Sequence, residues 1–321
     1  MMQALPSLQF GPHFDVAVQS CVGADPRTHL ENQDNFLLID TTGCAHYMYN
    51  QRRQSERIAS WPEGCARVAV LDGMGGHGRG REAAEAVVAG LINIPPCDSL
   101  AELTRHLDLL HVSLQHQFAA SEASKRPGTT LTMLELRPGK APLLYHVGDS
   151  RLYEVKDGRV HPMTVDHVPA TAFAMAGLLD EREWWQQVHG EHRSQISQAF
   201  ILGNAFANPN ELSDPLYALS PLNLPPYLYH LPDRRAVELD PSAVYVLATD
   251  GFWACSDPSD LLDRWPGLLA RHADSAGMTA ALFEEMLTRP PPNFHIDNLT
   301  AIVLRRLDHD QTAVPIEKTT I

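Results

Sequence analysis

The chain has 321 residues and carries 39 acidic against 25 basic side chains, which gives a formal net charge of −14. This surplus of negative charge disfavours nucleic acid and anionic membranes as partners. Five cysteines without a Cys-x-x-Cys pair form neither a disulfide framework nor a zinc ribbon pattern. The first residues lack the pattern of a secretory signal, and no apolar run reaches the roughly 20 residues that span a bilayer. We therefore expect a soluble, cytoplasmic protein.

Short apolar and β-branched runs predict strands, several of which alternate as antiparallel strands do. In chain order these runs are 14–22, 35–40, 67–72, 129–136, 142–148, 151–155, 243–249 and 299–307. Apolar spacing of three and four predicts helices at about 80–93, 99–120 and 181–198, after Ser256, and at 275–288. Strands and helices do not alternate strictly, so a parallel βαβ sheet is not predicted.

Two segments look inserted into an otherwise single domain that spans 1–321. The first, 41–65, is expected to be a long connection, and the second, about 168–240, a mobile subdomain. The tail from Asp308 onward is expected to be frayed, as chain ends often are.

The stretch VAVLDGMGGHGRGREAAEAVV, 68–88, reads as a strand, a glycine-rich turn and a helix. Its G-x-G-x-x-G, which begins at Gly73, has the spacing that cradles a dinucleotide pyrophosphate. However, Asp72 directly before it would repel a pyrophosphate and attract a hard cation. Pro95-Pro96 then leads into a second helix and not into the parallel strand of a dinucleotide-binding unit. A nucleotide-dependent oxidoreductase is therefore disfavoured.

Four aspartates stand at ends of predicted strands, namely Asp72, Asp149, Asp250 and Asp297. Each one alone is more often a turn residue than a ligand. Together they would place several carboxylates at the rim of a sheet, and clustered carboxylate oxygens suit magnesium or manganese. The combination therefore predicts a metal site.

The motifs around these aspartates are NQDN (32–35), LDGMGGH (71–77), GTT (128–130), VGDSR (147–151), TVDH (164–167), ATDGFW (248–253) and DNLT (297–300). In order and spacing they resemble the metal-dependent serine/threonine protein phosphatases of type 2C, in their bacterial form. The resemblance implies an α+β fold, an αββα sandwich in which two antiparallel sheets are flanked by helices. In this fold the segment 168–240 aligns with a flap beside the active site that influences substrate choice.

The resemblance also implies the catalytic metal ligands. Asp72 would bridge two manganese or magnesium ions, the Gly73 carbonyl would ligate the second ion, and Asp250 and Asp297 would ligate the first. Such a pair of ions activates a water for attack on phosphorus without a covalent phosphoenzyme.

Further positions follow from the same resemblance. Asp34 would hold a metal-bound water, and Asp149 would support a third, weaker metal ion of bacterial members. At the phosphate-binding position the family usually has arginine, but His29 stands there, and Arg27 is the alternative phosphate ligand.

His77 is a candidate proton donor, although packing of the loop is the favoured interpretation because Met74 occupies the family's general-acid position.

The implied function is hydrolysis of phosphoserine and phosphothreonine in proteins, by a monomer that opposes a serine/threonine kinase, such as those governing type VI secretion. The alternative is a catalytically weak or inactive phosphoprotein-binding module of the same fold. Inactive members usually lose a metal aspartate, and Asp72, Asp250 and Asp297 are all present. The intact set favours an enzyme.

Overall fold

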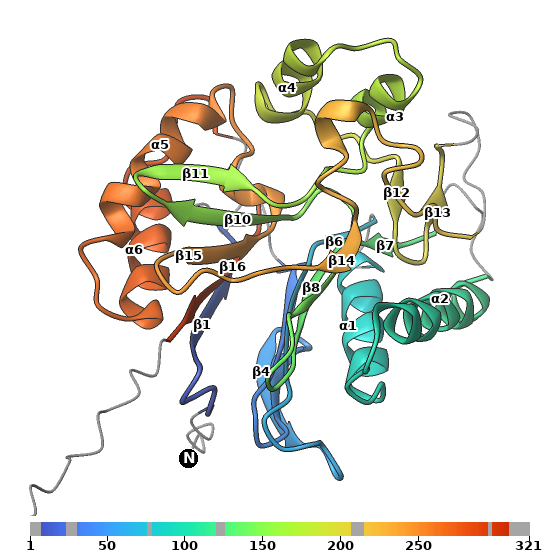
Figure 1. Ribbon diagram of the computed structural model, residues 1–321, viewed down its shortest axis with the longest axis vertical. Helices are drawn as coiled ribbons and strands as arrows, with labels where there is room; N and C mark the ends of the chain where they lie inside the picture. Colours follow the sequence, from blue (N-terminus) through green and yellow to red (C-terminus); the bar gives the residue numbers. More distant parts are fainter. Residues whose placement is uncertain are drawn as a thin grey trace, which may run out of the picture.

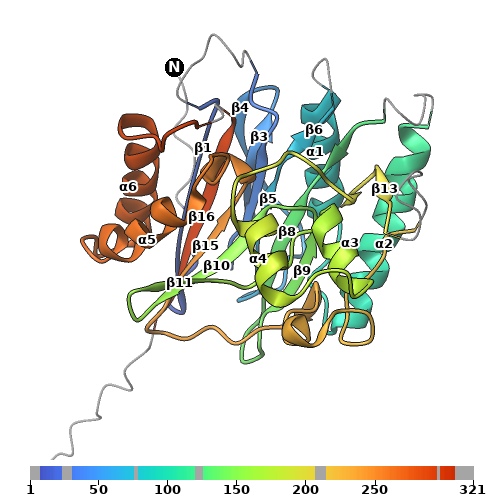
Figure 2. The ribbon, with the colours of Figure 1, turned by 90° about the horizontal axis from the view of Figure 1, so that it is seen from above.

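The computed structural model describes residues 8–23, 31–75, 79–119, 126–206, 215–294 and 297–307. They form four layers, with two antiparallel sheets stacked in the centre and a pair of helices outside each sheet (Figures 1 and 2). The predicted αββα sandwich is confirmed. Within the described ranges, no helix combines the length and apolar character needed to cross a membrane.

The larger sheet has seven antiparallel strands in the order β14-β9-β8-β5-β2-β3-β4. Their bounds are β2 Asn35–Ile39, β3 Cys44–Tyr49, β4 Arg52–Arg57, β5 Ala66–Leu71, β8 Leu131–Leu136, β9 Leu143–Val147 and β14 Arg234–Ala236. The smaller sheet has five antiparallel strands in the order β1-β16-β15-β10-β11. Their bounds are β1 Phe14–Cys21, β10 Arg151–Lys156, β11 Arg159–Pro162, β15 Val244–Ala248 and β16 Leu299–Arg306.

Alternation along the strands builds the core on both faces of the larger sheet. In β5, Val68 and Val70 point toward the smaller sheet, where they pack in one cluster with residues such as Leu247. Ala69 and Leu71 point the other way and pack against helices. Successive side chains of a strand face opposite sides, so burial of both faces explains why β5 is apolar from Val68 to Leu71.

Each outer layer is a pair of helices. Helices α1 (Arg79–Ile92) and α2 (Leu100–Gln117) cover the larger sheet, and α5 (Pro258–Leu269) and α6 (Ser275–Thr288) cover the smaller one (Figure 2). These helices and the eight predicted strands agree with the sequence-based expectation. Two short ribbons complete the structure, β6 (Gly73–Met74) with β7 (Gly128–Thr129), and β12 (Gln198–Ala199) with β13 (Gly203–Asn204).

Two sequence-based expectations are wrong. The segment 41–65 is not an unstructured connection, because β3 and β4 form a hairpin that adds two strands to the edge of the larger sheet. The sequence RRQSER of β4 concealed it, since a largely exposed edge strand lacks the apolar alternation by which strands are recognised. The helix expected over 181–198 is also shorter and ends at His189 before Gly190.

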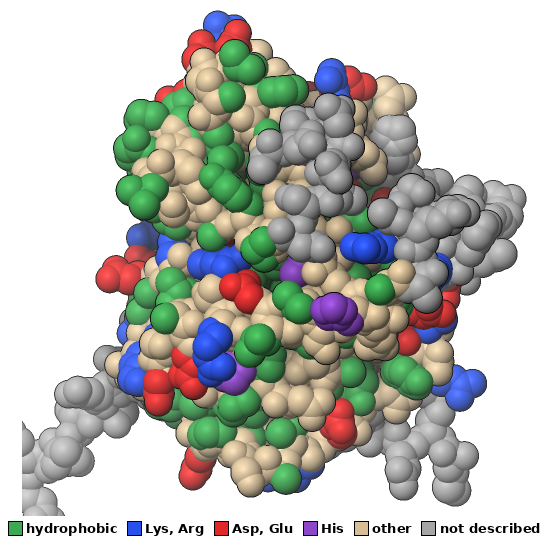
Figure 3. Space-filling view, turned by 90° about the vertical axis from the view of Figure 1, so that its right-hand side faces the viewer, with side chains coloured by type: hydrophobic (Ala, Val, Ile, Leu, Met, Phe, Trp, Pro, Cys, Tyr) green, Lys and Arg blue, Asp and Glu red, His purple; other side chains and the backbone are tan. Residues whose placement is uncertain are grey.

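The segment between β11 and β14 lies above the sheets and packs around its own apolar cluster (Figure 1). It contains α3 (Pro169–Met175), α4 (Glu181–His189), the β12–β13 ribbon and the 3₁₀ helix η2 (Pro226–Leu228). We call it the flap segment. In Figure 3, hydrophobic side chains gather over the upper part of the face that is shown. Among the described residues of the flap segment, the exposed large apolar side chains are Phe173, Leu178, Trp185, Leu222 and Tyr229. The tail expected to fray, from Asp308 onward, lies outside the described residues.

Candidate metal centre

The predicted aspartates lie at one end of the stacked sheets. Asp34 directly precedes β2 and Asp72 directly follows β5, and the register pairs Asn35 with Leu71, so these two carboxylates share one rim of the larger sheet. The antiparallel arrangement explains this placement, because the start of one strand lies beside the end of its neighbour.

The smaller sheet supplies carboxylates in the same way. Asp250 begins the 3₁₀ helix η3 (Asp250–Phe252) just after β15, and Asp297 lies just before β16, which pairs antiparallel with β15. Asp149 lies in the turn that carries the chain from β9 of the larger sheet to β10 of the smaller one. Five aspartates from both sheets thus face the same end of the sandwich.

The carboxyl groups influence one another's pKa values. Burial and the charges of Asp250, Asp34, Asp297 and Asp149 raise the pKa of Asp72 well above its ordinary value. Burial, followed by the charges of Asp297 and Asp250, likewise raises the pKa of Asp34. Burial and the charge of Asp250 raise the pKa of Asp149 to about 8. So many buried carboxyl groups repel one another unless a positive charge compensates them.

Hydroxyl groups of the neighbouring motifs hold two of the aspartates in place. The backbone N–H of Asp72 donates to Thr130 Oγ1 at 2.8 Å, and the N–H of Thr130 donates to the Asp72 carbonyl at 2.9 Å. The Thr249 hydroxyl donates to Asp34 Oδ2 at 2.8 Å and accepts from the N–H of Thr300 at 3.1 Å. The threonines of the GTT, TDG and DNLT motifs therefore have a structural role, because their hydrogen bonds hold Asp72 and Asp34 in position.

Close backbone approach explains two glycines of the motifs. A Cβ on Gly73 would lie 2.3 Å from the Gly80 carbonyl oxygen, and one on Gly251 would lie 2.0 Å from the Asn298 carbonyl oxygen. Real atoms do not approach so closely, so neither position accepts a side chain without a backbone shift. The loop after Asp72 and the turn after Asp250 are consequently packed directly on their neighbours.

A buried arginine connects the sheet with the flap segment. Arg151 of the VGDSR motif makes a salt bridge to Asp166 at 2.7 Å, donates to the Val188 carbonyl at 2.7 Å, and stacks 4.6 Å over the Trp253 ring. Val188 belongs to α4. Arg151 therefore fixes the flap segment beside the aspartates, and this is a structural role for both VGDSR and TVDH.

The structure adds one residue that sequence reasoning missed, His192 of the flap segment. Its Nε2 lies 3.2 Å from Asp250 Oδ2, and its backbone N–H donates to the Cys255 carbonyl at 3.0 Å. Burial alone would raise the pKa of Asp250, but the hydrogen bond and charge of His192 hold it below its ordinary value. No motif surrounds His192, so the sequence offered no signal for a contact that only the fold creates.

Three predicted positions cannot be placed. Arg27, His29 and His77 lie outside the described residues. The structure therefore does not test which side chain binds the phosphate or whether His77 donates a proton.

The donor set fits hard divalent cations. All five groups are carboxylates, which Mg²⁺ and Mn²⁺ prefer. Burial and the charges of neighbouring carboxylates raise the pKa of Asp34, Asp72 and Asp149, and a bound cation would favour their ionised forms. Among the described residues, no three of these aspartates have ligand atoms all within 4.8 Å of one another.

No protein-family model matches the chain. Protein phosphatase PhpP of Streptococcus pneumoniae is 30% identical over 126 residues, which are 37% of this chain and 51% of PhpP, so the match spans about half of that relative. Serine/threonine protein phosphatase PstP of Mycobacterium tuberculosis is 35% identical over 107 residues, 32% of this chain and 21% of PstP.

Among solved structures, a Streptococcus agalactiae serine/threonine phosphatase superposes with a TM-score of 0.63 at 18% identity and covers 92% of this chain and 100% of its own. The catalytic domain of PstP in complex with two manganese ions superposes with a TM-score of 0.55 at 22% identity over 92% of this chain and 99% of its own. The chain has the fold of these bacterial phosphatases, and the resemblance to type 2C phosphatases is confirmed.

Proposed function

We propose that this chain is a metal-dependent protein-serine/threonine phosphatase. The observation that carries the proposal is the convergence of buried carboxyl groups from both sheets, in which Asp72 is influenced by the charge of every other member. The curated relatives that share part of the sequence are protein phosphatases, and the shared fold extends over nearly the whole chain. The intact aspartates do not favour the alternative of an inactive phosphoprotein-binding module.

We assign the ligands of two manganese or magnesium ions to Asp72, the Gly73 carbonyl, Asp250 and Asp297. Asp72 would be shared by both ions, the Gly73 carbonyl would join it at the second ion, and Asp250 and Asp297 would bind the first. Asp34 would orient a water at the ions, and Asp149 would support a third, weaker ion. The PstP catalytic domain, which shares this fold, is in complex with two manganese ions, and this supports divalent cations as cofactors here.

When bound, two such ions supply a water activated for in-line attack on phosphorus and neutralise charge on the phosphoryl oxygens. Hydrogen bonds within the chain hold the proposed ligands in position. Thr130 clamps the backbone on both sides of Asp72, and Thr249 fixes the carboxylate of Asp34. Because Gly73 has no side chain, the loop after Asp72 packs closely against the backbone of Gln33 and Gly80, which fixes the position of the Gly73 carbonyl.

The expected partners are phosphoserine and phosphothreonine proteins and the serine/threonine kinase that phosphorylates them. Five free cysteines, three of them buried, fit a reducing compartment such as the cytoplasm.

The test is hydrolysis of a small phosphomonoester and of a phosphothreonine peptide, with and without manganese. Activity should require the metal and disappear in excess chelator. Asp72→Asn should lower kcat by on the order of 10³-fold or more, because the bridging charge is lost, whereas the matched surface variant Asp157→Asn should retain full activity. Full activity in excess chelator, or an unimpaired Asp72→Asn enzyme, would contradict the proposal.

A further inference from the structure

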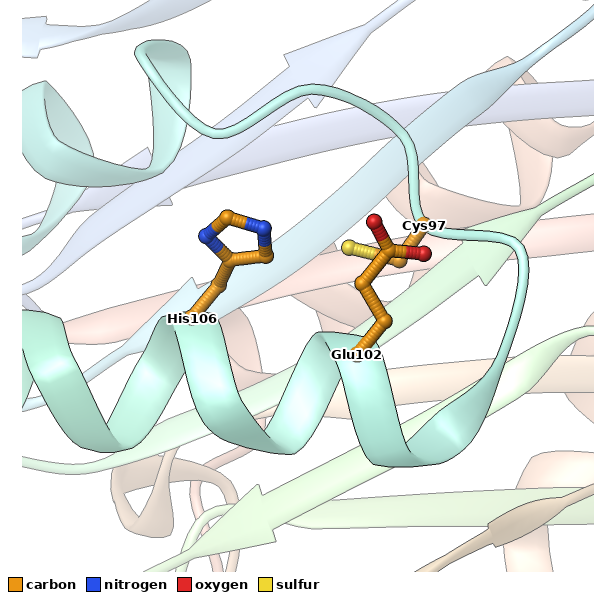
Figure 4. Close-up of side chains that lie close together, drawn as sticks. All are labelled: Cys97, Glu102 and His106. Carbon is orange, nitrogen blue, oxygen red and sulfur yellow. The ribbon is translucent and has the colours of Figure 1, made fainter.

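A second group of potential ligands lies on helix α2 and the loop before it. The sulfur of Cys97, a carboxylate oxygen of Glu102 and a ring nitrogen of His106 all lie within 4.8 Å of one another (Figure 4). Glu102 and His106 are one helical turn apart, so their side chains share a face of α2. From these contacts we infer that Cys97, Glu102 and His106 form a separate site for a single zinc-like divalent cation.

The backbone around Cys97 is held by a buried ion pair. The N–H of Cys97 donates to Glu135 Oε1 at 3.1 Å, and Glu135 is paired with Arg67 at 2.7 Å. Arg67 also donates to the carbonyl oxygens of Leu91 at 2.6 Å and Ile94 at 2.9 Å, at the end of α1 and just beyond it. The loop that carries the sulfur is therefore fixed to the larger sheet and does not have to be ordered by the cation.

Glu102 is also oriented before any cation binds. Ser99 caps α2 by accepting from the N–H of Glu102 at 3.2 Å, and Glu102 Oε2 accepts from the N–H of Asp98 at 2.9 Å. This hydrogen bond turns the carboxylate back toward the loop of Cys97 and leaves the other carboxylate oxygen for a cation. Two of the three ligands thus have their positions set by contacts that a cation would not disturb.

The donor types select the cation. Thiolate, imidazole and carboxylate are the ligands of zinc sites, and a thiolate selects zinc-like cations over magnesium and manganese. In a tetrahedral site with bonds of about 2.0–2.3 Å, ligand atoms stand roughly 3.3–3.8 Å apart, so each pair here has to close by about 1.5 Å at most. Three protein ligands leave a fourth position for water. This site would therefore take a different metal from the aspartates.

Two features oppose binding. Arg105 Nη2 lies 3.1 Å from His106 Nε2, but Arg105 is exposed, so its side chain can turn toward solvent. Burial, followed by the charge of Glu135, raises the pKa of the Cys97 thiol to about 11, so a cation must displace the thiol proton to bind the sulfur.

The experiment is titration of Co²⁺, as a spectroscopic substitute for zinc, into the full chain saturated with Mn²⁺. We expect one cobalt per chain with the near-ultraviolet absorption of a cobalt–thiolate bond, which excess zinc removes. Cys97→Ser should abolish this absorption, and His106→Ala should weaken cobalt binding by roughly tenfold or more.

The matched controls are two other cysteines. Cys44→Ser changes a buried thiol in β3. Cys21→Ser changes a thiol whose pKa is influenced by the nearby Asp34, so a loss of absorption in this variant would mean that the cobalt lies at the aspartates. Both should keep the absorption, as should Asp72→Asn, which separates this site from the proposed phosphatase centre.

Two results would overturn the inference: no cobalt–thiolate absorption in the wild-type chain at millimolar cobalt, or an undiminished absorption in Cys97→Ser. If Cys97→Ser does not fold, Glu102→Gln and His106→Ala decide the matter. Both should need more cobalt than the wild type to reach the same cobalt–thiolate absorption, and wild-type titration curves in both variants would refute the site.

Discussion

Asp149 should destabilise the metal-free protein at neutral pH, and Asp149→Asn should remove that cost. The side chain is buried, and burial together with the charge of Asp250 raises its pKa from 3.8 to about 8. Because the folded pKa lies above the unfolded one, the folded state keeps a proton that the unfolded state releases. This group therefore favours folding most below about pH 4, and its contribution is lost progressively as the pH rises toward 8.

The size of the effect follows from the same shift. One pKa unit corresponds to about 1.4 kcal/mol, so a proton retained over about three units at pH 7 costs up to ~4 kcal/mol. Local relaxation and water penetration reduce such a cost, and we expect about 2 kcal/mol. At roughly 2 °C per kcal/mol for a chain of this size, Asp149→Asn should raise the melting temperature of the metal-free protein by about 4 °C.

The assay is thermal unfolding in chelator between pH 5 and pH 8. The melting temperature of Asp149→Asn should exceed that of the wild type by a margin that increases as the pH rises. Asp157→Asn, at an exposed position in the β10–β11 turn, should have the melting temperature of the wild type at every pH. A difference in melting temperature between Asp149→Asn and the wild type that is the same at every pH would show only that the amide packs differently from the carboxyl group. A difference that does not grow between pH 5 and pH 8 would refute the reasoning.

Three further experiments test the surroundings of the proposed metal centre. Gly251→Ala places a Cβ 2.0 Å from the Asn298 carbonyl oxygen, so we expect kcat to fall by on the order of 100-fold and the melting temperature to fall as well. If kcat and the melting temperature equal those of the wild type, the backbone moves aside without cost. Arg27→Ala should raise KM more than His29→Ala does, because only arginine is a fully charged, forked phosphate ligand, and the opposite order would assign the phosphate to the histidine. His192→Ala should weaken manganese binding by roughly tenfold in calorimetry, whereas His192→Gln, which keeps a donor, should recover much of it. Equal manganese affinity in all three proteins would show that the histidine does not position its carboxylate neighbour.

The sequence alone was sufficient for most strands of the central layers and for the expectation that the aspartates gather at one end of them. Alternation and β-branching identified buried strands such as β5, because burial of both faces leaves a continuous apolar run. The aspartates were recognisable because each stands where a strand ends, and because glycine, threonine and asparagine beside them formed motifs in a specific order. The G-x-G-x-x-G spacing was misleading in isolation, and Asp72 decided between a nucleotide and a metal.

Other features depended on the tertiary structure. The hairpin β3–β4 has a largely exposed edge strand, so its sequence lacks the apolar signal, and pairing with β2 makes it a part of the sheet. His192 is 58 residues before Asp250 in the chain, and nothing in the local sequence links them. Their contact at 3.2 Å exists because Arg151 fixes the flap segment beside the strand ends.

Cys97, Glu102 and His106 illustrate the same limit at shorter range. Helical periodicity places Glu102 and His106 on one face, but the direction of the Cys97 side chain is set by the loop that Arg67 and Glu135 hold against the sheet. Local sequence determines periodicity and turn chemistry, because these depend on neighbours along the chain. Contacts between distant segments depend on how complete layers pack, and only the folded chain decides them.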